Sequence, residues 1–212
     1  MITMIGSLKG GSGKSTITFN LAVWLKMAGV DVIVVDADPQ ATLSDVMQVR
    51  NEEGYKPEIR RESATLLRDD PDVLRTHDQV LVDVGTASME NLRGAIGLAD
   101  RIIVPVPPSQ ADIWSTQRFL RFVAANAGGR EIEVLGFINR ADTHRAIRES
   151  DEAAAALISL PGIRFLKPRL AQRTAYRRSF SEGLAVFEQQ PRGKGSAEWH
   201  ALAAALYPDL VA

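Results

Sequence analysis

One short segment near the N-terminus constrains this chain more than any other. An apolar run over Met1–Gly6 leads into the loop Lys9-Gly10-Gly11-Ser12-Gly13-Lys14-Ser15, and a helical pattern follows over Ser15–Ala28. Glycines let backbone N–H groups turn inward onto phosphate oxygens without a side-chain clash. The following helix presents the positive end of its dipole to the same place. The segment therefore predicts a phosphate-binding loop between a buried strand and a helix.

The end of this loop supplies the side chains that a nucleotide triphosphate and its metal need. The generic pattern is a glycine, four residues, then Gly-Lys-Ser/Thr. Gly13-Lys14-Ser15 matches the end, whereas Leu8 stands at the position of the first glycine. We expect Lys14 to bridge the β- and γ-phosphates of ATP and the Ser15 hydroxyl to bind Mg²⁺. A glycine-rich turn without a ligand is the alternative, and the flanking strand and helix argue against it.

The rest of the chain alternates short apolar runs with segments of helical period, which predicts a parallel sheet covered on both faces. We therefore expect a single α/β domain over residues 1–212, a P-loop NTPase fold with a mostly parallel, twisted sheet. The polar stretch Arg50–Asp78 is predicted as a crossover with short helices. Further strands are expected at Val32–Val35, Gln79–Val84, Ile102–Val106, Glu131–Ile138 and Gly162–Leu166. Further helices are expected at about Ala87–Leu98, Asp112–Asn126, Arg145–Leu160, Arg169–Glu182 and Ser196–Leu206.

Composition excludes several classes of protein. The 212 residues include no cysteine, so disulfides, thiolate nucleophiles and cysteine-bound clusters are excluded. The net charge is −1, so any contact with nucleic acid must come from a local patch. The N-terminus lacks the pattern of a signal peptide, and no apolar run approaches the roughly 20 residues that span a bilayer. We expect a soluble, cytoplasmic protein that does not bind membranes.

Three motifs together resemble those of the ParA/MinD family of ATPases, which partition or position intracellular cargo. Lys9–Ser15 resembles the deviant Walker A motif of that family. Val34-Val35-Asp36-Ala37-Asp38-Pro39-Gln40 resembles its second motif, and Val80-Leu81-Val82-Asp83-Val84-Gly85 resembles its Walker B motif. The resemblance spans almost the whole chain and is closest to the short ParA-type members. It implies an ATP hydrolase that forms a homodimer around ATP.

The resemblance implies catalytic roles for Lys9, Lys14, Asp36 and Asp38. In the family, the lysine at the Lys9 position reaches across the dimer to the partner's ATP and neutralises charge that develops as the β–γ bridge breaks. Asp38 would orient the attacking water or the magnesium shell, and Asp36 would support it. Both follow a buried strand, where ligands bind in open α/β sheets. A helix cap with turn chemistry is the alternative for this pair.

The resemblance also assigns the metal and the base. Asp83 would hold Mg²⁺ through water, together with Ser15 and Asp38. Gly85 would let its loop move with the γ-phosphate, although the family often has a proline shortly after the aspartate and this chain does not. Asn139 and Pro168 would contact adenine. The complete set of predicted nucleotide-binding residues is Lys9, Gly10, Gly11, Ser12, Gly13, Lys14, Ser15, Thr16, Asn139 and Pro168.

A basic segment near the C-terminus, taken with the family resemblance, predicts contact with DNA, and a solvated helix face is the alternative. It carries six positive charges and no acid, and the rest of the chain, with 19 basic and 26 acidic residues, then has a charge of about −7. Arg169, Arg173 and Arg177 recur every four residues, so they are predicted to share one helical face. Such a stripe favours phosphate-backbone contacts without sequence specificity. The six residues are Arg164, Lys167, Arg169, Arg173, Arg177 and Arg178.

The resemblance thus favours a nucleoid-associated ATPase that positions a plasmid, a chromosome origin or a protein organelle. A cargo-bound adaptor would stimulate hydrolysis. Ser196–Ala212 has no lysine or arginine, so the basic amphipathic helix of the membrane-bound relatives is not expected. The alternative is a small-molecule P-loop enzyme, of the ligase or kinase type, that does not bind DNA. An iron–sulfur ATPase is excluded because the chain has no cysteine.

Overall fold

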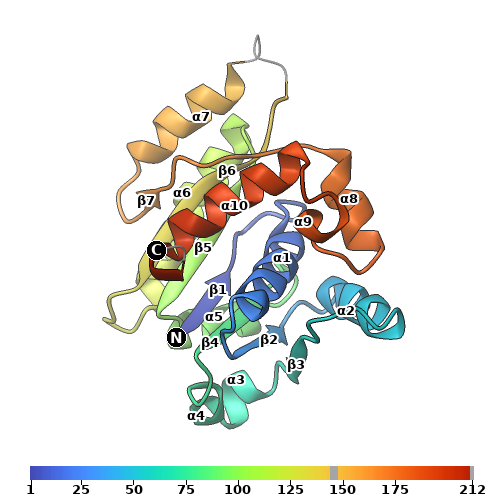
Figure 1. Cartoon of the computed structure of the whole chain (residues 1–212). Coiled ribbons are helices and arrows are strands. Elements are labelled where there is room, and N and C mark those ends of the chain that lie inside the picture. Colours follow the sequence, from blue (N-terminus) through green and yellow to red (C-terminus); the bar gives the residue numbers. More distant parts are fainter. Residues whose placement is uncertain (144–147, 211–212) are drawn as a thin grey trace.

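An eight-stranded sheet forms the centre of the molecule in a computed structural model that describes residues 1–143 and 148–210 (Figure 1). The strand order is β3-β2-β4-β1-β5-β6-β7, with β8 paired to β6, and every pairing is parallel. The strands are β1 (Ile2–Ile5), β2 (Val32–Asp36), β3 (Arg60–Ser63), β4 (Gln79–Asp83), β5 (Arg101–Val106), β6 (Glu133–Ala141), β7 (Arg164–Phe165) and β8 (Leu170–Ala171).

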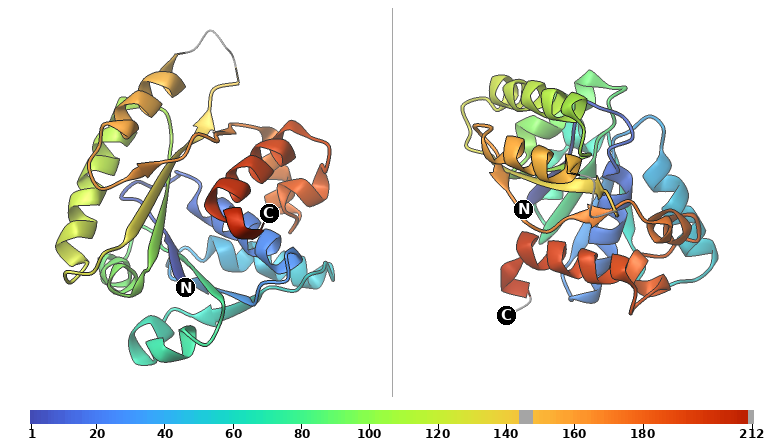
Figure 2. Two further views of the ribbon diagram at one scale, coloured as in Figure 1. Left: turned by 60° about the vertical axis from the view of Figure 1, so that its left-hand side comes forward. Right: turned by 90° about the horizontal axis from the view of Figure 1, so that it is seen from above.

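Helices cover both faces of this sheet (Figure 2). One face packs against α3 (Leu66–Asp69), α4 (Pro71–Leu74), α5 (Met89–Leu98), α6 (Gln110–Asn126) and α7 (Glu149–Ile158). The other packs against α1 (Lys14–Met27), α2 (Thr42–Glu52), α8 (Thr174–Ser181), α9 (Val186–Gln189) and α10 (Lys194–Leu206). A short 3-10 turn, Pro208–Leu210, follows α10. Among the described residues, no helix is both long enough and apolar enough to cross a membrane.

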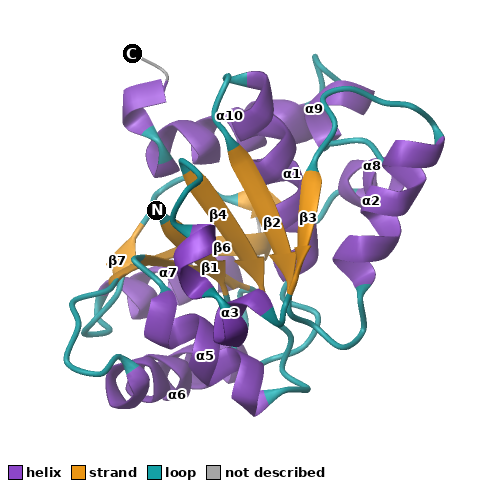
Figure 3. Cartoon of the chain, turned by 90° about the horizontal axis from the view of Figure 1, so that it is seen from below, coloured by secondary structure: helices purple, strands orange, loops and turns teal. Residues whose placement is uncertain are grey.

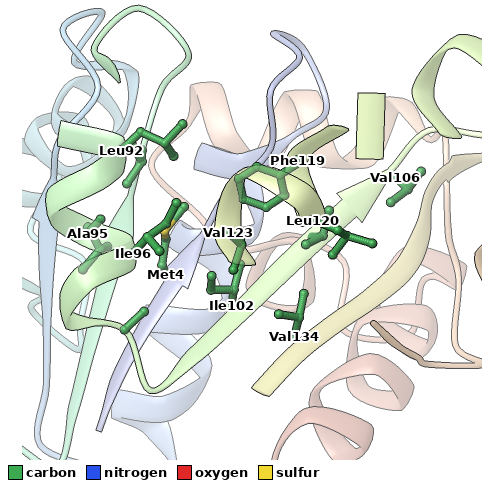
Figure 4. Packing of buried hydrophobic residues seen from close by; sticks show 14 of the residues in the cluster. Met4, Leu92, Ala95, Ile96, Ile102, Val106, Phe119, Leu120, Val123 and Val134 are labelled. Atoms are coloured by element: carbon green, nitrogen blue, oxygen red, sulfur yellow. The ribbon is translucent and has the colours of Figure 1, made fainter. Parts of the chain in front are cut away.

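The predicted fold class is therefore confirmed, and the apolar strands explain why. The central strands β1, β2 and β4 are almost completely buried, because helices cover both of their faces. On the face of α5 and α6, Met4 and Ile102 of the sheet pack against Ile96, Phe119 and Val123 of these helices (Figure 4). This packing fixes α5 and α6 side by side over β1 and β5.

The stretch before β4 differs from the prediction. Arg50–Asp78 was predicted to hold only short helices, but it also contains β3, which forms one edge of the sheet beyond β2 (Figure 3). The sequence of β3 is Arg-Arg-Glu-Ser, and its side chains are exposed or half-buried. A polar strand gives no apolar signal, so hydrophobic patterning cannot find it. Helix α2, which packs against α1, was also missed.

The helix predicted over Arg169–Glu182 is shorter than expected. Leu170 and Ala171 form β8, Arg173 has extended backbone angles, and α8 begins only at Thr174. The helix predicted over Arg145–Leu160 corresponds to α7, and its predicted start at residues 145–147 lies outside the described residues. The other predicted helices and strands agree with the structure to within a few residues.

Candidate nucleotide-binding site

The loop between β1 and α1 has the backbone conformation that its glycines allow. Gly11 and Gly13 have φ angles of 75° and 95°, in the left-handed region where a side chain is strained. Gly13 is also the N-cap of α1, and a Cβ atom there would lie 2.5 Å from the Asn139 Nδ2. No side chain caps α1, and its first turn contains no acid. The N-terminus of this helix is therefore available to an anion.

Lys14 is buried beneath this loop, in a position to bind a ligand. Its side chain is buried, and Nζ donates to the Lys9 carbonyl oxygen at 3.3 Å and to the Ser7 hydroxyl at 3.4 Å. Burial lowers the pKa of the Lys14 ammonium, whereas the carboxylates of Asp83 and Asp38 act in the opposite direction. A buried ammonium with long neutral contacts has unused capacity for phosphate oxygens.

Asp36 and Asp38 lie at the end of β2 and differ in their surroundings. Asp36 accepts hydrogen bonds from the Ser44 backbone N–H at 2.9 Å and from the Ser44 hydroxyl at 2.6 Å, so it braces the start of α2. Asp38 instead lines the pocket beside the phosphate-binding loop, which is called the phosphate pocket below. Its Oδ1 accepts a hydrogen bond from the Gln40 backbone N–H at 3.0 Å. Its carboxylate lies against Gly85, where an added Cβ would come within 2.2 Å of it.

Asp83 is a buried carboxylate whose two side-chain oxygens have no hydrogen-bond partner among the described residues. Burial raises the pKa of Asp83 to about 7, the Ser15 hydroxyl acts against this rise, and the charge of Asp36 adds to it. A buried carboxylate without partners is costly, so Asp83 fits a site for a cation and its water shell. In the described part of the chain, no three acidic, histidine or cysteine side chains are grouped to hold a metal alone. The residues thus suit Mg²⁺ bound mainly by phosphate, water and Ser15.

The raised pKa of Asp83 predicts how stability depends on pH without nucleotide or magnesium. The folded chain keeps this proton up to about pH 7, whereas the unfolded chain releases it near pH 4. The free energy of unfolding should therefore fall between pH 4 and 7, by at most about 1.4 kcal/mol per pH unit from this group. Asp83→Asn should remove this slope and raise the melting temperature at pH 8, measured by urea and thermal denaturation in EDTA. An unchanged slope would contradict the assignment, and Asp209→Asn is the exposed control.

The Lys9 side chain does not line the phosphate pocket. Its Nζ forms an ion pair at 2.9 Å with Oδ1 of Asp112, which is buried in the first turn of α6. Ser109, the N-cap of α6, donates to the same carboxylate. The Lys9 side chain is 47% exposed, so it can leave this carboxylate without breaking the core. Sequence analysis missed Asp112, because Ser109 followed by an acid three residues later indicates only a helix cap.

A second pocket adjoins the phosphate-binding loop and is large enough to hold a nucleobase. It has a volume of ≈ 320 Å³ and lies between the start of α1, the end of β6, and α8. Gly13, Thr16 and Arg140 line both this pocket and the phosphate pocket, so the two are continuous. Arg140 was not predicted. It has a φ angle of 56°, unusual for a residue other than glycine, and such strain occurs often at functional sites.

The two residues predicted to contact adenine have different positions. Asn139 lines the second pocket, but it lies within β6 rather than after it, and its Nδ2 donates to the Ser12 carbonyl oxygen at 2.7 Å. Pro168 does not line this pocket. Since β8 pairs with β6 so that Leu170 lies opposite Asn139, the pocket wall begins two residues after Pro168.

The predicted basic stripe is not one helical face, and this expectation was wrong. Three of its arginines lie outside α8 and form ion pairs: Arg164 with Glu133 at 2.6 Å, Arg169 with Asp151 at 2.6 Å, and Arg173 with Glu198. The partner acids come from other parts of the chain, so the sequence of the segment could not reveal them. Lys167, Arg177 and Arg178 are exposed, and the described residues offer them no ion pair.

A glycine loop between a parallel strand and a helix, with a buried lysine and an unpartnered aspartate beside it, defines a P-loop nucleotide-binding protein. A family model confirms this class: the CobQ/CobB/MinD/ParA nucleotide binding domain matches residues 3–186. The chain belongs to this family, and its relatives are positioning and partition ATPases of the ParA/MinD type.

Two curated relatives cover most of this chain. It is 27% identical over 198 residues to the maintenance of carboxysome distribution protein A of Halothiobacillus neapolitanus, covering 92% of this chain and 90% of the relative. It is 28% identical over 193 residues to protein ParA of Rhizobium radiobacter, covering 86% and 83%. Among solved structures, an ATP complex of Cyanothece McdA has a TM-score of 0.79 at 20% identity, covering 97% of this chain and 95% of that one. These matches agree with the predicted family and fold.

Proposed function

We propose that this chain hydrolyses ATP with Mg²⁺ and uses the cycle of binding and hydrolysis to position a cargo. The observation that carries the proposal is the arrangement of Lys14, Asp38 and Asp83 around one anion-binding loop. The same loop opens into the second pocket, which has room for a base. The Pyrococcus horikoshii MinD structure with Mg-ADP, at a TM-score of 0.73 and 21% identity, has the same fold and supports a nucleotide as ligand.

The side chains of the site divide the chemistry between them. The loop N–H groups and Lys14 bind the phosphates and hold their negative charge. Asp38, at the pocket wall, accepts a hydrogen bond from the attacking water and orients it. Ser15 and Asp83 would hold Mg²⁺ and its water shell, and the metal would supply positive charge to neutralise the phosphates. Asp36 positions Asp38 through the Asp38 backbone N–H, which donates to Asp36 at 3.2 Å.

Lys9 completes the site only when a second copy binds. We propose that ATP brings two copies together, and that Lys9 then leaves Asp112 and reaches the phosphates held by the partner. The exposure of the Lys9 side chain and its single carboxylate partner, Asp112, support this change of partner. The relatives named for carboxysome distribution and for partition support a cargo such as a protein organelle or a plasmid. An adaptor on the cargo would stimulate hydrolysis.

DNA binding belongs to the proposal with a revised set of residues. We assign the contact to Lys167, Arg177 and Arg178, because Arg164, Arg169 and Arg173 are occupied by carboxylates. Arg177 and Arg178 are adjacent on α8, which closes the second pocket. One protomer offers few phosphate contacts and should bind weakly, whereas an ATP-bound dimer offers twice as many and gains avidity.

The test is a mobility shift with random duplex DNA, with and without ATP, across a salt series. We expect binding to need ATP, to weaken steeply with salt, and to fall at least 10-fold, by an order-of-magnitude estimate, in an Arg177→Glu, Arg178→Glu variant. Arg60→Glu is the control, since it reverses an exposed charge on β3 rather than on α8. Normal ATP hydrolysis with equal DNA binding in both nucleotide states would support the small-molecule enzyme instead.

A further inference from the structure

The outer face of α6 carries an exposed ridge that the nucleotide site does not use. Its inner face, with Phe119 and Val123, belongs to the core (Figure 4). Ile113 of the same face is part of this core as well. On the opposite face, Trp114, Arg118 and Arg121 are exposed and recur at helical spacing, so they form one line along the helix. Trp114 is 56% exposed, whereas Trp199 is completely buried. A large aromatic side chain left in solvent in this way indicates a binding surface.

The ridge is basic, and no carboxylate of the described residues pairs with its arginines. Arg118 and Arg121 have no carboxylate in ion-pair distance among residues 1–143 and 148–210, and neither has Arg93 on the neighbouring helix α5. Arg93 lies over the ring of Phe122 at 5.8 Å, so it stands beside the ridge on the α5 side. Three guanidinium groups on α6 and the neighbouring α5, without ion pairs among the described residues, attract an acidic surface.

An apolar groove borders the other side of the ridge. It has a volume of ≈ 460 Å³ and lies between the second half of α6 and the turn after α7. Its lining is mainly aliphatic, with Leu120, Ala124, Ile132 and Leu160 as members, and Arg121 stands at its rim. An occupant must therefore present apolar side chains to the groove and acidic groups to the ridge.

We propose that this surface, the α6 ridge of Trp114, Arg118 and Arg121 with its adjoining groove, docks an acidic amphipathic helix of the partner protein. This inference rests on the proposed function, because the docked helix would belong to the adaptor proposed above. Apolar residues at helical spacing on the occupant would fill the groove, as in other helix-in-groove contacts, and flanking carboxylates would pair with the arginines. Trp114 lies two residues from Asp112, so the docked helix would lie beside the turn that holds Lys9.

Two other occupants fit this surface less well. A second copy bound through a two-fold axis at this surface would bring the same basic ridge of both copies together, and like charges would repel. A nucleic acid would match the arginines, but its phosphates and sugars would leave Leu120, Ile132 and Leu160 in the groove without apolar partners. Both remain distinguishable in the experiment below.

The test uses the full-length chain and two synthetic peptides about four turns long. Both are amphipathic helices with the same leucine stripe, and one has glutamates on its polar face where the other has lysines. Binding is measured by fluorescence anisotropy of labelled peptide across a salt series. We expect the glutamate peptide to bind at least 10-fold more tightly than the lysine peptide. We expect Trp114→Ala, or Arg118→Glu with Arg121→Glu, to lower its affinity at least 10-fold.

Matched controls decide between the occupants. Met27→Ala removes another exposed apolar side chain, and Arg177→Glu with Arg178→Glu reverses two exposed charges on α8; neither should affect peptide binding. The proposal is overturned if both peptides bind equally, if neither binds, or if the α6 variants lose DNA or ATP-dependent dimers instead. A chain that binds the glutamate peptide but hydrolyses no ATP would contradict the proposed function and leave this surface standing.

Discussion

Replacing Asp38 or Lys14 by alanine should stop ATP turnover for two separable reasons. Asp38→Ala should still bind ATP, because the loop N–H groups and Lys14 hold the phosphates, but hydrolysis should slow roughly 100-fold without the carboxylate that orients water. Lys14→Ala should lose binding itself by a similar factor of roughly 100, the worth of charge-assisted hydrogen bonds to phosphate. Equilibrium binding of a fluorescent ATP analogue and steady-state phosphate release separate the two effects.

The difference in ATP affinity between the Asp38→Ala and Lys14→Ala variants is the decisive result. Asp38 lines the pocket wall, whereas Lys14 lies at its floor, so only the lysine should decide affinity. If both variants lose ATP binding equally, Asp38 has been misassigned. Asp45→Ala is a suitable control, since it removes an acid of the following helix α2 that does not line the pocket.

Lys9→Ala should bind ATP and dimerise but hydrolyse roughly 1000-fold more slowly, by analogy with cations supplied in trans to a phosphoryl group. Because Lys9 is proposed to act on the partner's nucleotide, a mixture of Lys9→Ala and Asp38→Ala should recover measurable hydrolysis. In a mixed dimer, the Lys9→Ala protomer keeps its own Asp38 and receives Lys9 from its partner. Light scattering with ATP and phosphate release on mixing provide the two measurements.

The ion pair with Asp112 supplies the control for this experiment. Asp112→Asn should free Lys9 and leave hydrolysis equal or faster, because the carboxylate competes with phosphate for the ammonium. Lys26→Ala removes another lysine of an ion pair and should have no effect. A monomeric protein at saturating ATP, or no recovery in the mixture, would show that Lys9 does not act across a dimer.

Much of the site could be predicted because it is local in sequence. Lys14 and Ser15 belong to one loop, Asp38 follows β2 and Asp83 ends β4, so parallel pairing brings them to one edge of the sheet. The register confirms this step, since Asp36 lies opposite Asp83. The pattern of apolar strands was sufficient to place these residues together without any contact information.

The errors involve partners that are far apart in the sequence. Arg173 was predicted in a helical stripe, but Glu198 on α10 neutralises it. Asp112 was missed because its partner Lys9 is more than 100 positions away. The predicted contact of Pro168 with adenine, which the family resemblance implied, remains a prediction. Such pairings depend on the tertiary fold, and one sequence gives no spacing rule for them.

The polar strand β3 has a consequence for behaviour at high local concentration. A parallel sheet that ends in a free strand exposes backbone groups that can pair with another copy. Here the strand carries Arg60, Arg61 and Glu62, which discourage such pairing. If this chain gathers around a cargo as proposed above, its copies meet one another at high local concentration. With this edge charged, crowding alone should not polymerise the protein, so the proposed ATP-dependent dimerisation should remain its main route to association.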